Sequence, residues 1–305
     1  MTFGFRFSQP AAMQRDRMKG GMKLRTTRRG FLGAAGLASL GAVAVPDASA
    51  AIEPTPWGLK LGIATYTFRN FDRAKVIEMI RQVRTPWISV KNTEQQLSLK
   101  STPEQLAAAR KEFDDAGLKV MSAGNIDMTH AATVEELRPL FEYAKGARLP
   151  MMVCAPTHEN LKAVETLVKQ YDIRIAIHNH GPEDKHFPTP ESVLEAVRGL
   201  DPRMGLCMDI GHSARTGADV VEAIASAGSR LLDMHVKDLA DLSKRESQCD
   251  VGDGLMPFPR IFRQLKKMNY QGCVNLEYEI NADNPLPGVQ RSFSYMRGVL
   301  AGLAG

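Results

Sequence analysis

The chain has 305 residues, of which 39 are Lys or Arg and 34 are Asp or Glu, giving a formal net charge of +5. That length suits one large domain or two small ones. Eight of the basic and two of the acidic residues lie in the first fifty positions, so residues 51–305 carry a net charge of −1. This balance excludes the basic excess expected of a nucleic-acid-binding domain. The four cysteines lack the C-x-x-C spacing of a zinc ribbon and leave disulfide pairing open.

Residues 1–50 are predicted to be an export signal that is separate from the fold. Arg28 and Arg29 stand before an apolar run of small residues at 33–45, and an A-x-A cleavage pattern follows at 48–50. Paired arginines ahead of such a run are typical of the bacterial twin-arginine pathway. We therefore expect twin-arginine export to the periplasm, without a stable membrane anchor because the run is short for a bilayer. Retention of the segment as an uncleaved anchor is the alternative.

From residue 57 onward, short apolar runs alternate with longer amphipathic segments. The predicted strands are Leu59–Tyr66, Trp87–Val90, Leu118–Ala123, Met151–Cys154, Ile173–His178, Met204–Asp209, Leu231–His235 and Cys273–Glu277. The predicted helices are Asp72–Val83, Thr102–Ala116, Thr133–Lys145, Glu159–Tyr171, Thr189–Leu200, Ala218–Ala227, Phe258–Met268 and Val289–Ala301. Thr-Pro pairs at 102 and 189 predict helix starts, and Gly117 predicts a helix stop.

Eight strand-then-helix units in about 250 residues predict a single α/β domain, a (β/α)8 TIM barrel over residues 51–305. A doubly wound open sheet is the rival fold. It usually carries a Gly-rich phosphate-binding turn after its first strand, whereas residues 63–68 contain no glycine.

Four of the predicted strands in the second half of the chain end in an imidazole or a carboxylate. These residues are His178, Asp209, His235 and Glu277. The C-terminal ends of barrel strands share one mouth, and side-chain alternation directs all four side chains inward. Two imidazoles and two carboxylates suit one divalent ion, which we expect to be Mn, Co, Fe, Zn or Mg. The ligand types do not choose among them.

Four short motifs carry a resemblance to a known family. They are HNHGPED at 178–184, MDIGH at 208–212, MHVKD at 234–238 and LEYE at 276–279. Over roughly residues 59–300 the chain resembles the xylose-isomerase-like sugar isomerase/epimerase superfamily. By position, the resemblance implies that Asp209, His235 and Glu277 bind one metal ion. His178 stands where the better-known epimerases have a glutamate, and this departure resembles the inosose-dehydratase-like branch and exported relatives that act on keto-sugars.

The expected chemistry is removal of a proton next to a carbonyl in a carbohydrate, with the metal ion as Lewis acid. His180 or Glu183 is the expected base, His212 is expected to contact substrate oxygens, and Lys237 is expected to steady the enolate. A surface position is the alternative for Lys237. Because His178 replaces one of the two glutamate bases of the epimerases, we expect a lyase or hydratase more than an isomerase or epimerase.

Tyr66, Phe68 and Lys91 are expected to contact the substrate, with the two aromatic residues forming an apolar wall against a sugar face. Because the chain carries an export signal, we expect a non-phosphorylated sugar; a homo-oligomer is possible. The turn Gly252-Asp253-Gly254 either closes over the ligand or is a plain turn. Two other classes remain: an endonuclease-IV-like repair enzyme, which the net charge disfavours, and a sugar-binding barrel without catalysis.

Overall fold

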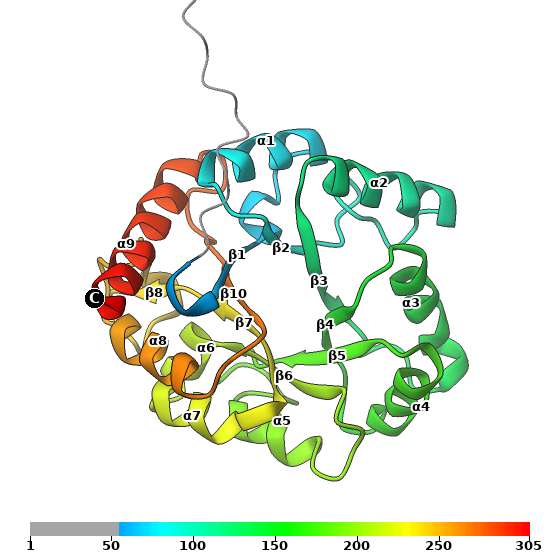
Figure 1. Ribbon diagram of the computed structural model, residues 1–305. Coiled ribbons are helices and arrows are strands. Elements are labelled where there is room, and N and C mark those ends of the chain that lie inside the picture. The colour runs from blue at the N-terminus through cyan, green and yellow to red at the C-terminus, as the bar shows by residue number, and fades with distance from the viewer. Residues whose placement is uncertain (1–54) are drawn as a thin grey trace, which may run out of the picture. The chain divides into compact units, whose positions relative to one another are not determined.

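Eight parallel strands close into a barrel and helices surround it (Figure 1). The computed structural model describes residues 55–305, so the predicted export signal at 1–50 lies outside the described part of the chain. The strands are β1 (Lys60–Ala64), β2 (Trp87–Val90), β3 (Lys119–Asp127), β4 (Met151–Ala155), β5 (Arg174–His178), β6 (Met204–Asp209), β7 (Leu231–Val236) and β10 (Cys273–Leu276). They follow one another around the barrel, and β10 pairs with β1 to close it. Closure confirms the predicted TIM barrel and excludes the open sheet.

Most of the surrounding helices begin at a residue whose side chain caps them, whereas α4, α8 and α9 have no side-chain cap. They are α1 (Arg73–Val83), α2 (Pro103–Asp115), α3 (Val134–Gly146), α4 (Leu161–Tyr171), α5 (Pro190–Ala196), α6 (Ile210–Arg215), α7 (Val220–Ala227), α8 (Phe258–Lys267) and α9 (Leu286–Ala304). Thr102 and Thr189 each form a capping box with the residue three positions on, as their sequence pattern predicted. Gly117, at a φ of 76°, follows the end of α2 and confirms the predicted stop.

Three of the local features that differ from the sequence prediction bear on the site. The first strand ends at Ala64, because Thr65–Phe68 turns into a 3-10 helix. The short helix α6 follows β6 directly, with Asp209 as its N-cap residue. In the long connection after β7, β8 (Asp238–Leu239) and β9 (Gln248–Cys249) form a small antiparallel ribbon. All three lie at the C-terminal mouth, where the polar strand ends are found.

Because side chains alternate along each strand, its apolar residues divide between two layers. One layer packs against the helices and the other faces the barrel interior. Ile175 and Ile177 of β5 pack outward with the helices, in the large core. Ala176, between them, points into the barrel interior and packs with Met151, Val153, Cys207 and Leu232. Burying each large aliphatic side chain contributes about 1.5–3 kcal/mol, so this alternation strongly selects the register that directs His178 inward.

The barrel interior below the mouth also contains a polar network. The buried Asp233 carboxylate accepts hydrogen bonds from Ser122 Oγ and from Asn275 Nδ2, both at 2.8 Å. Burial raises the pKa of Asp233 to about 6.

All four cysteines are free thiols. Among residues 55–305, none of the helices has the length and apolar character needed to cross a membrane.

Candidate metal centre and active site

Four polar side chains from neighbouring strands meet at the mouth of the barrel. His178 ends β5, Asp209 ends β6, His235 lies one residue before the end of β7, and Glu277 follows β10. Asp209 and His235 are paired directly across β6 and β7. All four residues are buried. The barrel topology thus brings together residues that are up to about a hundred positions apart in the chain.

The donor atoms of these residues are spaced as ligands of a single ion would be. His178 Nε2 lies 3.1 Å from His235 Nδ1, and His235 Nδ1 lies 3.3 Å from Glu277 Oε1. Asp209 Oδ2 is 3.7 Å from His178 Nε2. One donor atom of each residue lies within 4.8 Å of the other three. Two nitrogen ligands of a tetrahedral zinc ion, each about 2.0–2.1 Å from the metal, are about 3.4 Å apart, so the spacing fits one divalent ion.

The protonation states of His178 and Glu277 also suit a metal ion, whereas that of His235 does not. Burial and the neighbouring imidazoles of His180 and His235 hold the pKa of His178 well below its usual value, which keeps that ring neutral. Burial opposes ionisation of Glu277, but Lys237 and His235 outweigh it and hold its pKa well below the usual range. For His235, burial is outweighed by the thiol and the carboxylate beside it, which hold its pKa well above its usual value. A metal ion would have to displace a proton there.

Lys237 lies inside the site, not on the surface. Its Nζ is 3.0 Å from both Asp209 Oδ2 and Glu277 Oε2, and it also forms an ion pair with Glu279. Burial disfavours the ammonium, but the three carboxylates outweigh burial and raise the pKa of Lys237 well above its usual value. Gly211 makes room for the lysine stem, since a Cβ there would lie 2.6 Å from Lys237 Cγ. The site therefore holds a fixed positive charge beside its carboxylates.

His180 is oriented by a residue on each side of its ring. Its Nδ1 lies 3.0 Å from Asp184 Oδ2 and must donate, because a carboxylate only accepts. Its Nε2 lies 2.8 Å from Asn125 Nδ2 and accepts from that amide. Burial opposes ionisation of Asp184, but His180 and two backbone N–H groups outweigh it and lower its pKa to about 2. The His180 Nε2 lone pair is thus directed to the Asn125 amide, which also lines the cavity, on a ring held by a carboxylate.

His212 is oriented by Arg215, three residues along α6. Arg215 Nη2 lies 2.9 Å from His212 Nδ1 and donates to it, which leaves the proton of the neutral ring on Nε2. Burial lowers the pKa of His212 to about 4. Arg215 also binds both carboxylate oxygens of Glu183, at 2.5 and 2.7 Å, and so lowers the pKa of Glu183 to about 2. Glu183 is therefore an ionised carboxylate bound by a guanidinium at the rim.

These groups open into a cavity of about 540 Å³, within the roughly 300–1,000 Å³ of small-molecule sites. Its lining is polar and comes from most of the loops at the mouth. The lining residues are Tyr66, Lys91, Asn125, Asp127, Thr129, Ala155, Pro156, His178, His180, Glu183, Asp184, His186, His212, Arg245, Glu277 and Glu279. A site of this shape and polarity suits a small polyhydroxylated ligand.

Of the three predicted substrate contacts, Tyr66 and Lys91 line the cavity and Phe68 does not. Lys91 Nζ lies 5.4 Å from the centre of the Tyr66 ring and donates to the backbone oxygen of Asn125 at 3.1 Å. Burial lowers the pKa of Lys91. Phe68 is fully buried in the core. The prediction that Phe68 forms an aromatic wall with Tyr66 is therefore wrong. The 3-10 turn at residues 65–68 breaks strand alternation and directs Phe68 away from the mouth.

The turn at residues 252–254 is held to the barrel and does not line the cavity. The buried Asp238 carboxylate accepts backbone hydrogen bonds from Gly252, Gly254 and Met256, at 2.9, 3.2 and 2.9 Å. Of the two readings left open by the sequence, the structure shows the plain turn. Arg245, from the same long connection, is the residue that reaches the cavity.

The sequence did not single out several residues that the structure places at the site. Asp184 and Arg215 were within reach of sequence reasoning, because they follow His180 by four residues and His212 by three. Asn125 had no such signal, since only the barrel brings β3 beside the loop after β5.

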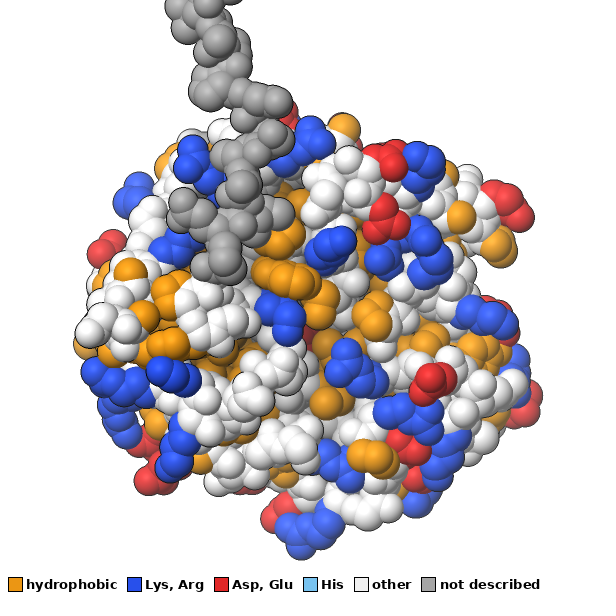
Figure 2. Space-filling view, in the orientation of Figure 1, with side chains coloured by type: hydrophobic (Ala, Val, Ile, Leu, Met, Phe, Trp, Pro, Cys, Tyr) orange, Lys and Arg blue, Asp and Glu red, His pale blue; other side chains and the backbone are white. Residues whose placement is uncertain are grey.

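The face of the molecule in Figure 2 agrees with the balanced charge of residues 51–305. On the face in Figure 2, Lys and Arg side chains mix with Asp and Glu around the rim, and no single-sign surface covers it. The surface in this view does not have the continuous basic face that an enzyme acting on DNA would need.

Comparison with known proteins gives a family-level match. The family model described as xylose isomerase-like TIM barrel matches residues 90–299, more than half of the chain. An inosose dehydratase from Mesomycoplasma hyopneumoniae (strain 7448) is 28% identical over 153 residues. The match covers 44% of this chain and 50% of the dehydratase, so the chain spans about half the length of that relative.

Two solved structures with the same fold match this chain over almost the whole of their own length. The crystal structure of the IOLI protein with a zinc atom has a TM-score of 0.66 and 16% identity, over 80% of this chain and 99% of the other. The apo structure of 3-keto-D-glucoside 4-epimerase, YcjR, from E. coli has a TM-score of 0.65 and 15% identity, over 79% and 99%. At these identities the two structures support the fold alone.

Proposed function

The chain belongs to the xylose isomerase-like TIM-barrel family, and on that premise we propose that it is a metal-dependent enzyme that removes a proton next to the carbonyl of a non-phosphorylated keto-sugar. The observation that carries this proposal is the pairing of two features in one cavity. A buried four-residue group that fits a divalent ion reaches the cavity through His178 and Glu277, and an oriented imidazole, His180, lines the same cavity. A sugar-binding barrel without catalysis would need neither.

A divalent ion held by His178, Asp209, His235 and Glu277 would act as a Lewis acid that acidifies the C–H beside the carbonyl. The protein supplies the remaining groups. Lys237 places a fixed ammonium next to Asp209 and Glu277, where it offsets negative charge that develops on substrate oxygen. The zinc atom in the IOLI structure supports a metal in this fold.

His180 is the proposed base. Asp184 holds the proton on Nδ1, so Nε2 has the lone pair. That lone pair accepts from Asn125 Nδ2 in this structure and takes a proton from the substrate carbon when the substrate displaces the amide. The C–H bond breaks, its electron pair enters the enediolate, and the proton moves to His180 Nε2. Glu183 is less suited to this step, because Arg215 binds both of its oxygens and lowers its basicity.

The fate of the enediolate decides between two reactions. In elimination, its electron pair forms a carbon–carbon double bond and a β-oxygen leaves, protonated by the His180 imidazolium formed in the first step to give water or an alcohol, while the Nε2–H of His212 donates a hydrogen bond to that oxygen. In isomerisation, a proton returns to carbon instead. We propose elimination, because His178 occupies the position from which the epimerases present a second carboxylate base. The inosose dehydratase relative supports this choice; the epimerase remains the second candidate, on the likeness to YcjR.

Product analysis in deuterated water tests the proposal. The metal-loaded protein is incubated with keto-sugars and keto-glycosides, and products are followed by NMR. We expect loss of water or of an alcohol, and a rate about 10²–10⁴-fold lower in His180→Ala. His130→Ala, which changes an exposed histidine outside the cavity lining, is the matched control. Stereochemical inversion with deuterium at the reacting carbon and no elimination product would establish the epimerase instead. Failure of every keto-sugar to exchange its α-proton would reject both reactions.

We further propose that the protein is exported through the twin-arginine pathway, on the basis of Arg28, Arg29 and the apolar run that follows them. Export would place the enzyme where free sugars and glycosides arrive from outside the cell. A substrate without phosphate fits that location.

A further inference from the structure

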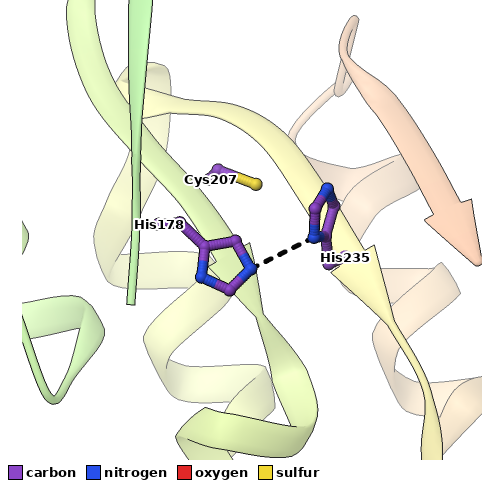
Figure 3. A group of neighbouring side chains, drawn as sticks. All are labelled: His178, Cys207 and His235. Carbon is purple, nitrogen blue, oxygen red and sulfur yellow. Dashed lines mark hydrogen bonds between the residues drawn. The ribbon is translucent and has the colours of Figure 1, made fainter. Parts of the chain in front are cut away.

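A buried thiol lies directly below the proposed metal ligands. Cys207 stands two residues before Asp209 on β6, so its side chain points to the same inner face of the barrel. It is fully buried and pairs in register with Asp233 of β7. The other members of this interior layer are apolar, but the Cys207 sulfur lies within 4.8 Å of a ring nitrogen of His178 and of His235. Figure 3 shows its sulfur pointing toward the ring of His235.

His178 and His235 belong to two possible ligand sets. One set adds the carboxylates of Asp209 and Glu277, and the other adds the Cys207 sulfur. In the second set, as in the first, one donor atom from each residue lies within 4.8 Å of the others. Each imidazole has a ring nitrogen, Nδ1 of His178 and Nε2 of His235, that is buried and forms no hydrogen bond with the residues described. Buried ring nitrogens without a partner are unusual for a merely packed interior.

We propose that Cys207 supplies a sulfur ligand to a thiophilic metal ion held by His178 and His235. The inference rests on the proposed metal centre and names a ligand beyond its four oxygen and nitrogen donors. Ions that favour sulfur, such as Zn²⁺, Co²⁺ and Cd²⁺, bind at the lower set of two nitrogens and one sulfur. The thiol gives up its proton to solvent when the sulfur–metal bond forms. Mn²⁺ and Mg²⁺, which favour oxygen, use the carboxylates of Asp209 and Glu277.

The consequence is that the position of the bound ion depends on its ligand preference. Ions that favour sulfur bind lower in the barrel, and ions that favour oxygen bind nearer the mouth. Thiolate and imidazole ligands are typical of zinc sites, whereas carboxylate and water ligands suit Mg²⁺ and Mn²⁺. A centre with both sets in reach of the same two histidines binds either class of ion but with different ligands. Removing Cys207 therefore weakens binding of the thiophilic ions selectively.

Cobalt spectroscopy of the purified full-length protein tests this assignment. The protein is stripped with a chelator, reloaded with Co²⁺ and examined for a sulfur-to-cobalt charge-transfer band in the near ultraviolet, with bound cobalt counted by elemental analysis. We expect the band in the wild type, its loss in Cys207→Ser and Cys207→Ala, and its retention in Cys154→Ala. Cys154 is a matched control because it is equally buried but packs in the outer core. Circular dichroism establishes that each variant is folded.

Competition between metals gives a second measurement. In Cys207→Ser, affinity for Cd²⁺ should fall by at least about tenfold, the smaller loss seen when even a supporting residue of a metal site is removed, while affinity for Mn²⁺ stays the same. A wild-type protein that binds cobalt without the charge-transfer band, and unchanged Cd²⁺ affinity in the variant, would overturn the sulfur ligand but leave the proposed function standing. If the wild type binds no divalent ion at all, the metal centre and the sulfur ligand both fail.

Discussion

Asp184 offers a quantitative check on how the proposed base is held. Its Oδ2 accepts from His180 Nδ1 at 3.0 Å, and its Oδ1 accepts from the backbone N–H groups of His186 and Phe187, at 2.8 and 3.1 Å. The pKa of Asp184 falls from 3.8 to about 2. Such a shift corresponds to about 2 kcal/mol of stability at neutral pH. The side chain is only 15% exposed, so solvent screening removes little of this amount.

The pH dependence of this contribution has a definite sign. A carboxyl group whose pKa is lowered by folding stabilises the protein fully above its unfolded pKa of 3.8, and the contribution is lost as the pH falls through about 2. Asp184→Asn should therefore lower the free energy of unfolding by about 2 kcal/mol at neutral pH. The difference from wild type should shrink toward zero as the pH approaches 2.

Urea unfolding of wild type and variant at pH about 7, about 4 and about 2 measures that difference. Asp253→Asn, which changes an exposed carboxylate in the 252–254 turn, is the control and should differ little from wild type at any of these pH values. A deficit in Asp184→Asn that is as large at pH 2 as at pH 7 would refute the reasoning, because lost packing does not titrate.

The same substitution should also impair the proposed reaction. Asparagine presents an amide N–H₂ or a weaker acceptor to His180 Nδ1, so the carboxylate no longer holds the proton on that nitrogen. With the proton on Nε2, the ring cannot accept a proton from the substrate. We expect α-proton exchange in deuterated water to slow by about 10²–10⁴-fold, with bound metal unchanged. Exchange at the wild-type rate would show that the Asp184 carboxylate is not needed to keep His180 in its reactive form.

Three further predictions concern the metal centre, the export signal and the backbone at the site. Asp209→Ala and His235→Ala should each lose the bound divalent ion, of which we expect about one per chain, while the barrel stays folded; full metal occupancy in both variants by elemental analysis would contradict the ligand assignment. Replacing Arg28 and Arg29 with Lys should leave unprocessed precursor in the cytoplasm, and normal periplasmic product in cell fractions would reject the twin-arginine reading. Gly181→Ala should cost about 1–3 kcal/mol, because φ is 85° and the added Cβ would lie 2.6 Å from a neighbouring guanidinium nitrogen; unchanged urea unfolding would argue against this strain.

Much of the fold and the core of the candidate site could be predicted from the sequence. Strand positions follow from short apolar runs, and helix starts follow from Thr-Pro pairs that form the capping boxes now seen. The inward direction of His178 follows from strand alternation, because a register shift of one residue would move Ile175 and Ile177 out of the core. Parallel strands in a closed barrel end at one mouth, so His178, Asp209 and His235 could be placed together before the structure was known.

The remaining features depend on contacts between distant segments, which local pattern does not encode. The position of Phe68 was predicted wrongly because residues 65–68 turn as a 3-10 helix. An apolar run alone does not distinguish that turn from a continued strand. The hydrogen bond of Asn125 to His180 joins side chains 55 positions apart. Lys237 is held inside the site by three carboxylates, and a sequence cannot distinguish that position from a surface lysine. Local alternation and capping thus determined which residues face inward, whereas barrel closure alone decided which of them contact one another, because those contacts form only when distant strands are brought side by side.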